Sequence, residues 1–253
     1  MKNEAVMDIQ LSKNKQLLGA YDRIVVKMHL QRQQYNHSIF LVCGTDPRVG
    51  ASSVALHLAA GLAKSGQKIL LLDADMRKEM SKKGFGDTYK ATLADYLTKD
   101  ITMDKIIYGT TIKKLSIIPG GVAADPVQLL CSGKMKILLE ILRGYYDFVL
   151  IDVPSVGATA DANAILGYVD QVVLVAAPER SYKKQILECY ETFQKYGVNL
   201  LGVVVNRVDK YGYHDYVKNA SYYMDNENKN IWIRILQKIK EKGKAIKETK
   251  RKK

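Results

Sequence analysis

Short apolar runs alternate along this chain with longer segments whose apolar residues recur at helical spacing. The short runs are apolar at nearly every position, which is typical of strands buried on both faces of a parallel sheet. They predict strands at residues 38–43, 68–72, 115–118, 148–151, 171–176 and 201–205. The predicted helices cover residues 16–34, 52–65, 92–97, 126–145, 160–168 and 183–196.

This alternation predicts an α/β fold: a doubly wound, mostly parallel sheet with helices on both faces. Ligands of such sheets bind at the carboxyl ends of the strands. A chain of 253 residues, 47% of them hydrophobic, can fill one such core and carry appendages. We expect an N-terminal helical segment at 1–35, a central α/β domain at 36–210, a tyrosine-rich segment at 211–224 and a basic amphipathic tail at 225–253.

The net charge of +13 is concentrated in the tail. Residues 229–253 hold eleven Lys or Arg against Glu241 and Glu248, so nine of the net positive charges lie there. An apolar helical stripe that includes Trp232 is typical of a helix at an anionic membrane surface. An acidic partner and a plain solvated extension are the alternatives. The chain has no recognised nucleic-acid-binding module, so no nucleic acid is expected as a partner.

Other classes of function find little support in the composition. No run approaches 18 consecutive apolar residues, and the polar first fifteen residues have no apolar segment, so we expect neither a membrane span nor a secretory signal. Cys43, Cys131 and Cys189 lack metal-ligand spacing, as do the four histidines. We therefore expect reduced thiols in the cytosol rather than a zinc site.

The segment after the first predicted strand is rich in turn residues and precedes an apolar helix. Aligned on Gly50 and Ser52, it follows the G-x-x-x-x-G-K-[ST] pattern of a phosphate-binding loop, with Thr45 at the position of the first glycine and Ala51 at the position of the lysine. Loop amides cradle phosphate groups, whereas the lysine adds a charge near the β- and γ-phosphates that an alanine methyl cannot supply. Full replacement of that charge by Arg48 or Arg77 is not expected. The predicted nucleotide-binding residues of the loop are Gly44, Thr45, Asp46, Pro47, Arg48, Val49, Gly50, Ala51, Ser52 and Ser53.

Three later strand ends carry polar side chains. Asp73 and Asp75 follow the second strand, where they are candidate catalytic residues that would face a metal and an incoming hydroxyl. Asp152 ends an apolar strand as a magnesium-holding aspartate does, and the amide of Asn206 could bind an adenine edge. The predicted metal ligands are Ser52, Asp73 and Asp152. An aspartate at a strand end is also a common turn or helix cap, so the prediction depends on the order and spacing of all the motifs together.

These motifs make the chain resemble the bacterial tyrosine kinases of capsule and exopolysaccharide synthesis (BY-kinases), which are MinD/ParA-like P-loop ATPases. The resemblance spans about residues 19–223. Residues 70–78 are similar to the family's second aspartate motif (Walker A′), and residues 146–154, followed by Asp161 and Ala162, to its Walker B strand. The family's P-x-N-P-x-E-L-L segment is matched by residues 118–121 and 125–130.

The resemblance implies that residues 36–210 form a P-loop NTPase-like kinase domain that uses ATP or ADP and Mg²⁺. It also implies phosphoacceptor tyrosines at Tyr211, Tyr213, Tyr216, Tyr222 and Tyr223, although the same segment could be a loop packed on the sheet edge. Two departures put catalysis and ring assembly in question. Residues 47–52 lack the first glycine, the glutamate and the lysine of the family's P-G-E-G-K-[ST], and residues 19–25 lack the charges of its ring-building E-x-x-R-x-x-R motif.

The resemblance therefore implies a catalytically impaired regulator of polysaccharide synthesis that binds nucleotide weakly or not at all. It would lie at the inner face of the bacterial plasma membrane, docked to a membrane-embedded activator or to a polymerisation or export protein. An active paralogous kinase could phosphorylate it in trans. The first alternative is an active ATP-dependent tyrosine autokinase in which another cation replaces the lysine. The second is a ParA/MinD-like positioning ATPase, although Asp46 stands where that group has a second lysine.

Overall fold

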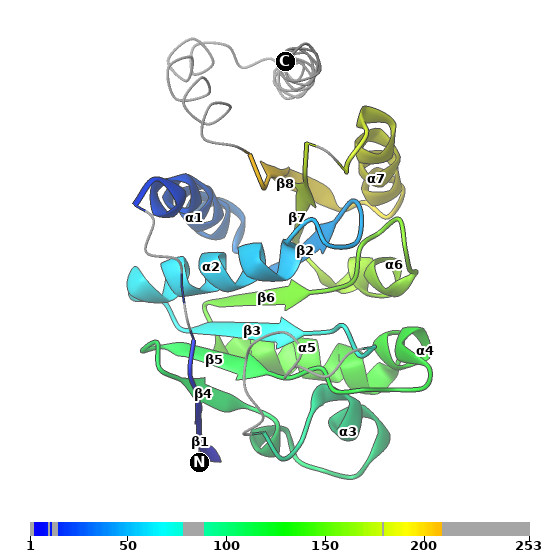
Figure 1. Cartoon of the computed structure of the whole chain (residues 1–253). Helices are drawn as coiled ribbons and strands as arrows, with labels where there is room; N and C mark the ends of the chain where they lie inside the picture. Colours follow the sequence, from blue (N-terminus) through cyan, green and yellow to red (C-terminus); the bar gives the residue numbers. More distant parts are fainter. Residues whose placement is uncertain (1–2, 10, 12–14, 78–88, 179, 209–253) are drawn as a thin grey trace, which may run out of the picture.

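The computed structural model describes residues 3–9, 11, 15–77, 89–178 and 180–208 (Figure 1). They form an eight-stranded sheet in the order β1-β4-β5-β3-β6-β2-β7-β8. All ladders from β5 to β8 are parallel, whereas β4 is antiparallel to β5 and parallel to β1. The strands are β1 (Asn3–Met7), β2 (Ile39–Gly44), β3 (Ile69–Asp73), β4 (Tyr108–Thr110), β5 (Leu115–Ile118), β6 (Phe148–Asp152), β7 (Gln171–Ala176) and β8 (Asn199–Val205).

Helices cover both faces of this sheet, as the sequence predicts for a doubly wound fold. Residues of α1 and α2 belong to the apolar cluster on one face, and residues of α3 to α7 belong to the cluster on the other. The helices are α1 (Lys15–Tyr35), α2 (Ala51–Lys64), α3 (Leu93–Thr98), α4 (Pro126–Leu130), α5 (Gly133–Tyr145), α6 (Asp161–Ile165) and α7 (Lys183–Lys195), with short 3-10 turns η2 (Met103–Lys105) and η3 (Leu166–Tyr168).

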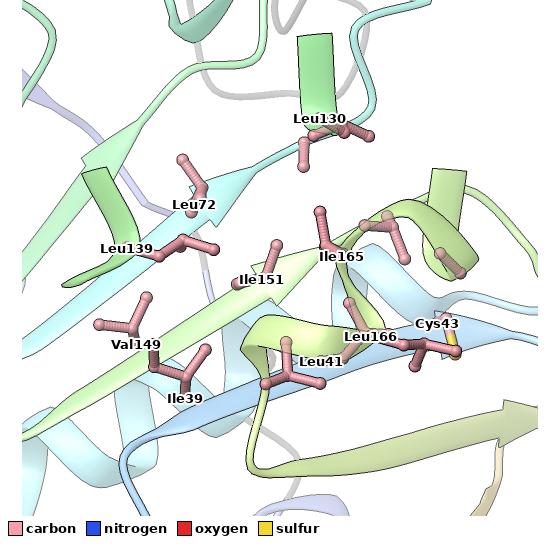
Figure 2. Packing of buried hydrophobic residues seen from close by; sticks show 14 of the residues in the cluster. Ile39, Leu41, Cys43, Leu72, Leu130, Leu139, Val149, Ile151, Ile165 and Leu166 are labelled. Carbon is pink, nitrogen blue, oxygen red and sulfur yellow. The ribbon is translucent and has the colours of Figure 1, made fainter. Parts of the chain in front are cut away.

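Successive residues of each central strand enter opposite clusters. In β2, Ile39, Leu41 and Cys43 face α4, α5 and α6, whereas Phe40 and Val42 face α1 and α2. Figure 2 shows the first of these packing layers, where side chains of β2, β3 and β6 meet those of the helices. Because both faces of the central strands are buried, the strands read as continuous apolar runs in the sequence.

Some predicted elements differ from the structure. The helix expected at 126–145 is divided into α4 and α5, because Ser132 caps a new helix by accepting a hydrogen bond from the amide of Met135 at 3.2 Å. The end of the helix expected at 160–168 is the 3-10 turn η3. Strands β1 and β4 were not predicted, since β4 has only three residues and β1 lacks an apolar run.

The tyrosine-rich segment and the basic tail lie outside the described residues, so the expectations for them stay predictions. The same holds for the division of the chain into four segments. Within the described part, none of the helices has both the length and the apolar character needed to span a bilayer.

Candidate functional site

The carboxyl ends of β3, β6 and β2 lie next to one another in the sheet. Asp73 and Asp152 are paired across the β3–β6 ladder, and the amide of Ala74 donates to the carbonyl of Asp152 at 2.8 Å. On its other side Asp152 is paired with Val42, shortly before the loop that follows β2. The fold thus brings together two of the predicted aspartates, Asp73 and Asp152, and the predicted loop, which are distant in the sequence.

Both of these aspartates are buried. Asp73 is 3% exposed and Asp152 is 5% exposed. The Oδ1 atom of Asp73 accepts a hydrogen bond from the amide of Asp75 at 3.1 Å, and Oδ1 of Asp75 accepts one from the amide of Arg77 at 3.3 Å. The turn after β3 is therefore held by its own carboxylates, so the capping role of strand-end aspartates is present here beside any role in metal binding.

The loop after β2 is compact. Gly44 has no space for a side chain, since an added Cβ would lie 2.7 Å from Cγ2 of Val49. Gly50 has φ of +92°, in the left-handed region, and Arg48 has φ of +64°. A Cβ on Gly50 would also lie 2.3 Å from Nδ2 of Asn206. Gly44, just before the pattern, and Gly50, its second glycine, are therefore required by the backbone path and by close neighbours.

The loop leads directly into α2. The helix begins at Ala51, no side chain caps it at Gly50, and its first turn has no acidic residue. Such a helix start presents backbone N–H groups to an anion. Ser52 is half-buried and Ser53 is exposed, while Ala51 packs against the apolar cluster under α2.

Asn206 lies at the same edge, beyond β8. Its backbone amide donates to the carbonyl of Ala176 at 2.8 Å, and its side-chain Nδ2 donates to the carbonyl of Val49 at 2.9 Å. The predicted fourth strand end thus reaches the site. In this structure the amide group of Asn206 binds the loop itself, a contact that the sequence did not indicate.

Two more residues that contact the loop were not predicted. The hydroxyls of Thr45 and Ser181 lie 2.6 Å apart, and Nε2 of Gln185 donates to Oδ1 of Asp46 at 2.8 Å. Ser181 and Gln185 belong to the segment that starts α7, some 140 residues after the loop. No local motif marks them, because the contacts depend on how β7 and β2 are paired.

The cations proposed as substitutes for the lysine differ in their surroundings. Arg77 donates from Nε to Oδ2 of Asp161 at 3.1 Å and from Nη2 to Oδ1 at 2.6 Å. Arg48 is exposed on the loop. The guanidinium of Arg77 would have to break a bidentate ion pair with a buried carboxylate to reach a phosphate, which argues against it as a replacement.

A magnesium nucleotide fits several features of this site. The loop and the start of α2 suit a phosphate, and the side-chain oxygens of Ser52, Asp73 and Asp152 are ligand types that Mg²⁺ takes. Among the described residues no group of three or more His, Cys, Asp or Glu could hold a metal ion. Mg²⁺ would therefore rely on phosphate and water oxygens as well as on the protein. The poorest part of the fit is the position of the missing ammonium, at Ala51.

Comparison with known proteins places these motifs in a family. The AAA_31 family model, described as an AAA domain, matches residues 45–200. A putative tyrosine-protein kinase in the cps region of Klebsiella pneumoniae is 32% identical over 72% of this chain, and this match spans only 26% of that relative. The tyrosine-protein kinase CpsD of Streptococcus pneumoniae serotype 4 is 30% identical over 69% of this chain and 79% of its own length.

Solved structures give the same picture. The kinase domain of the Escherichia coli tyrosine kinase ETK superposes with a TM-score of 0.72 and 29% identity, over 76% of each chain. The septum site-determining protein MinD of Pyrococcus horikoshii, solved in complex with Mg-ADP, has a TM-score of 0.58 and 27% identity over 71% of this chain and 76% of its own. The eight-stranded, mostly parallel sheet is thus the P-loop NTPase fold of tyrosine kinases and MinD.

Proposed function

Because this chain belongs to the AAA-domain family of P-loop ATPases, and within it to the bacterial tyrosine kinases, we propose that it is a catalytically impaired, kinase-like regulator of capsular or exopolysaccharide synthesis. The observation that carries the impairment is Ala51 at the start of α2, on a loop that otherwise has the shape of a phosphate site. Within the described residues, Arg77 is committed to Asp161.

The residues present would still serve a nucleotide. Loop amides and the start of α2 would bind phosphates, and Ser52, Asp73 and Asp152 would hold Mg²⁺, which neutralises phosphate charge when bound. Asp73 and Asp75 would face an incoming tyrosine hydroxyl. A single well-placed cation is worth about 10³–10⁵ in rate in the case of arginine fingers, and we expect a comparable loss from the missing lysine.

We further propose that such a protein acts by docking. Its partner would be a membrane-embedded activator, or a polysaccharide polymerisation or export protein, at the inner face of the plasma membrane. An active paralogue would phosphorylate Tyr211, Tyr213, Tyr216, Tyr222 and Tyr223 in trans, and the basic tail would bind anionic lipid. The kinship with tyrosine kinases named for capsule and exopolysaccharide loci supports this role.

Calorimetric titration with Mg-ADP and Mg-ATP tests the proposal. The unmodified protein is expected to bind weakly, and Ala51→Lys to bind roughly tenfold more tightly or better, because an ammonium–phosphate hydrogen bond is added. Ala51→Met is the control of similar length without a charge, and it should not gain affinity. If neither the unmodified protein nor Ala51→Lys binds, the nucleotide site is refuted.

The second candidate function is an active tyrosine autokinase, which is favoured by the tyrosine-kinase names of the relatives. Purified protein incubated with Mg-ATP would then acquire phosphotyrosine, and Asp73→Ala would abolish it. Tight binding of Mg-ATP by the unmodified protein, together with this phosphorylation, would replace the impaired regulator by the autokinase.

A further inference from the structure

The first half of the phosphate loop is tied to the segment that starts α7. Nε2 of Gln185 donates to Oδ1 of Asp46 at 2.8 Å, and the hydroxyls of Thr45 and Ser181 lie 2.6 Å apart. Oγ of Ser181 also accepts a hydrogen bond from the backbone amide of Ala177 at 3.0 Å. Two consecutive loop residues are thus bound through side chains to one distant segment of the chain.

The orientation of Gln185 is fixed at both ends of its amide. Oε1 accepts a hydrogen bond from the backbone amide of Tyr182 at 2.7 Å, which leaves Nε2 directed at the Asp46 carboxylate. An amide side chain is the group that accepts at one atom and donates at the other. A glutamate would keep the contact with Tyr182 and would place an oxygen against the oxygen of Asp46.

The carboxylate of Asp46 depends strongly on this donor. Its second oxygen, Oδ2, is buried and has no hydrogen-bond partner among the described residues. Burial, followed by the nearby charge of Asp46, raises the pKa of Cys189 on α7 to about 11, as expected for a carboxylate directed at this helix. A partly buried carboxylate that loses a charge-assisted hydrogen bond is destabilised, so the loop would leave its present position.

The second half of the loop is held from another direction. Nδ2 of Asn206 binds the carbonyl of Val49 at 2.9 Å, next to Gly50. The two flanks of the loop are therefore fixed by residues that follow β7 and β8. Neither contact uses the lysine position or a nucleotide.

We propose that Gln185 is a positioning residue that holds Asp46, and through it the phosphate loop, in a preformed shape before any nucleotide binds. The role rests on the proposed nucleotide-binding function and extends it. On this proposal, neither a lysine nor a phosphate is needed to order the loop. It is ordered by side chains at the start of α7 and just after β8.

Hydrogen–deuterium exchange of the full, nucleotide-free chain tests this directly. Gln185→Glu should speed exchange of the amides at residues 45, 46 and 48–50 by roughly tenfold, because one charge-assisted hydrogen bond becomes a repulsion. Gln194→Glu, the same substitution at an exposed position of the same helix, should leave this exchange unchanged. The double variant Asp46→Asn with Gln185→Glu should restore slow exchange, since the new amide can donate to the new carboxylate.

Rescue separates positioning from general damage to the fold. The positioning role is wrong if the loop amides of Gln185→Glu exchange at the same rate as those of Gln194→Glu. It is also wrong if the loop amides of the double variant exchange as fast as those of Gln185→Glu alone. Mg-ADP titration of the same four proteins addresses the proposed function separately. A complete lack of binding with the expected exchange pattern would refute the nucleotide function and leave the bracing of the loop intact.

Discussion

Arg77 and Asp161 form a bidentate ion pair in which the carboxylate is fully buried and the guanidinium is partly exposed. The pair joins the turn after β3 to the first turn of α6. It therefore fixes the segment that carries Asp73 and Asp75 against α6. Arg77 is the cation nearest to these aspartates in the sequence, and its pairing with Asp161 makes it unsuitable as a substitute for the lysine.

Loss of Arg77 should be costly. Arg77→Ala leaves the buried carboxylate of Asp161 without its partner, so we expect the free energy of unfolding to fall by about 3 kcal/mol. The free energy of unfolding of Arg77→Lys should lie between those of the unmodified protein and Arg77→Ala, because an ammonium cannot reproduce the planar two-bond geometry. Urea denaturation measures both. Lys136→Ala, which removes an exposed pair with Glu140, is the control and should cost less than about 1 kcal/mol. Equal losses for the two alanine variants would contradict the prediction.

The Asp170 carboxylate gives the protein an acid-sensitive contribution to stability. Burial alone would raise the pKa of Asp170, but hydrogen bonds from Arg143 and from the amides of Ile39 and Ser38 outweigh it and lower the pKa. A lowered folded-state pKa stabilises the fold above the unfolded value of about 3.9, and this stabilisation is lost as the pH falls through the folded-state pKa.

Asp170→Asn should therefore be less stable than the unmodified protein at pH 7, by about 1–3 kcal/mol. The difference should shrink below about pH 4, where the unfolded chain takes up a proton at this position, and should vanish once the pH falls below the lowered folded-state pKa of Asp170. Urea titrations at pH 7, 5, 4 and 3 would follow this. A difference that stays constant over the whole range would show that the charge of Asp170 is not the cause.

Gly50 should tolerate no side chain. Gly50→Ala places a Cβ in the left-handed region and 2.3 Å from Nδ2 of Asn206, so we expect a loss of about 2 kcal/mol and release of the bond to Val49. Thermal or urea unfolding gives the loss, and exchange of the backbone amides of Val49 and of residue 50 reports the release. Gly144→Ala is the matched control, because a Cβ added at Gly144 in α5 would have no neighbouring atom within 4 Å. The free energy of unfolding of this variant should rise by up to about 1 kcal/mol.

The three cysteines should differ in reactivity. Cys131 is exposed, whereas Cys43 and Cys189 are buried. Burial is the main cause that raises the pKa of Cys43 well above its usual value and that of Cys189 to about 11, so neither is an effective nucleophile at pH 8. Brief treatment with iodoacetamide should label Cys131 alone, as read by mass spectrometry, and urea should expose the other two. Fast native labelling of Cys43 would mean that the end of β2 opens readily.

The central strands could be predicted from the sequence because their periodicity is imposed by burial on both faces. The strands β1 and β4, at one edge of the sheet, could not be predicted in this way. The pairing of β1 with β4 is made by backbone hydrogen bonds, which leave little trace in residue type. The break before Ser132 had a local signal, a serine three residues before its capped amide, but the apolar pattern on either side of it concealed the break.

The sequence likewise predicted the main residues of the candidate site but not their contacts. Motifs located Asp73, Asp152, the loop and Asn206, because each follows a strand and the ends of parallel strands meet at one edge. The partners of these residues were not visible. Gln185, Ser181 and the pairing of Arg77 with Asp161 arise from contacts across 84 to 139 residues of sequence, which no spacing rule describes.

The strand order has a consequence for dividing the chain. Residues 1–77 supply β2 and β3 to the middle of the sheet, whereas β5, β6 and β7 come from residues after 88. In the sheet β3 lies between β5 and β6, and β2 lies between β6 and β7, so strands from the two parts of the chain alternate. A chain cut between 77 and 89 would yield two pieces, neither able to form a contiguous central sheet alone. Mixed together, the two pieces should fold only as a complex, and only that complex would contain both the phosphate loop and Asp152.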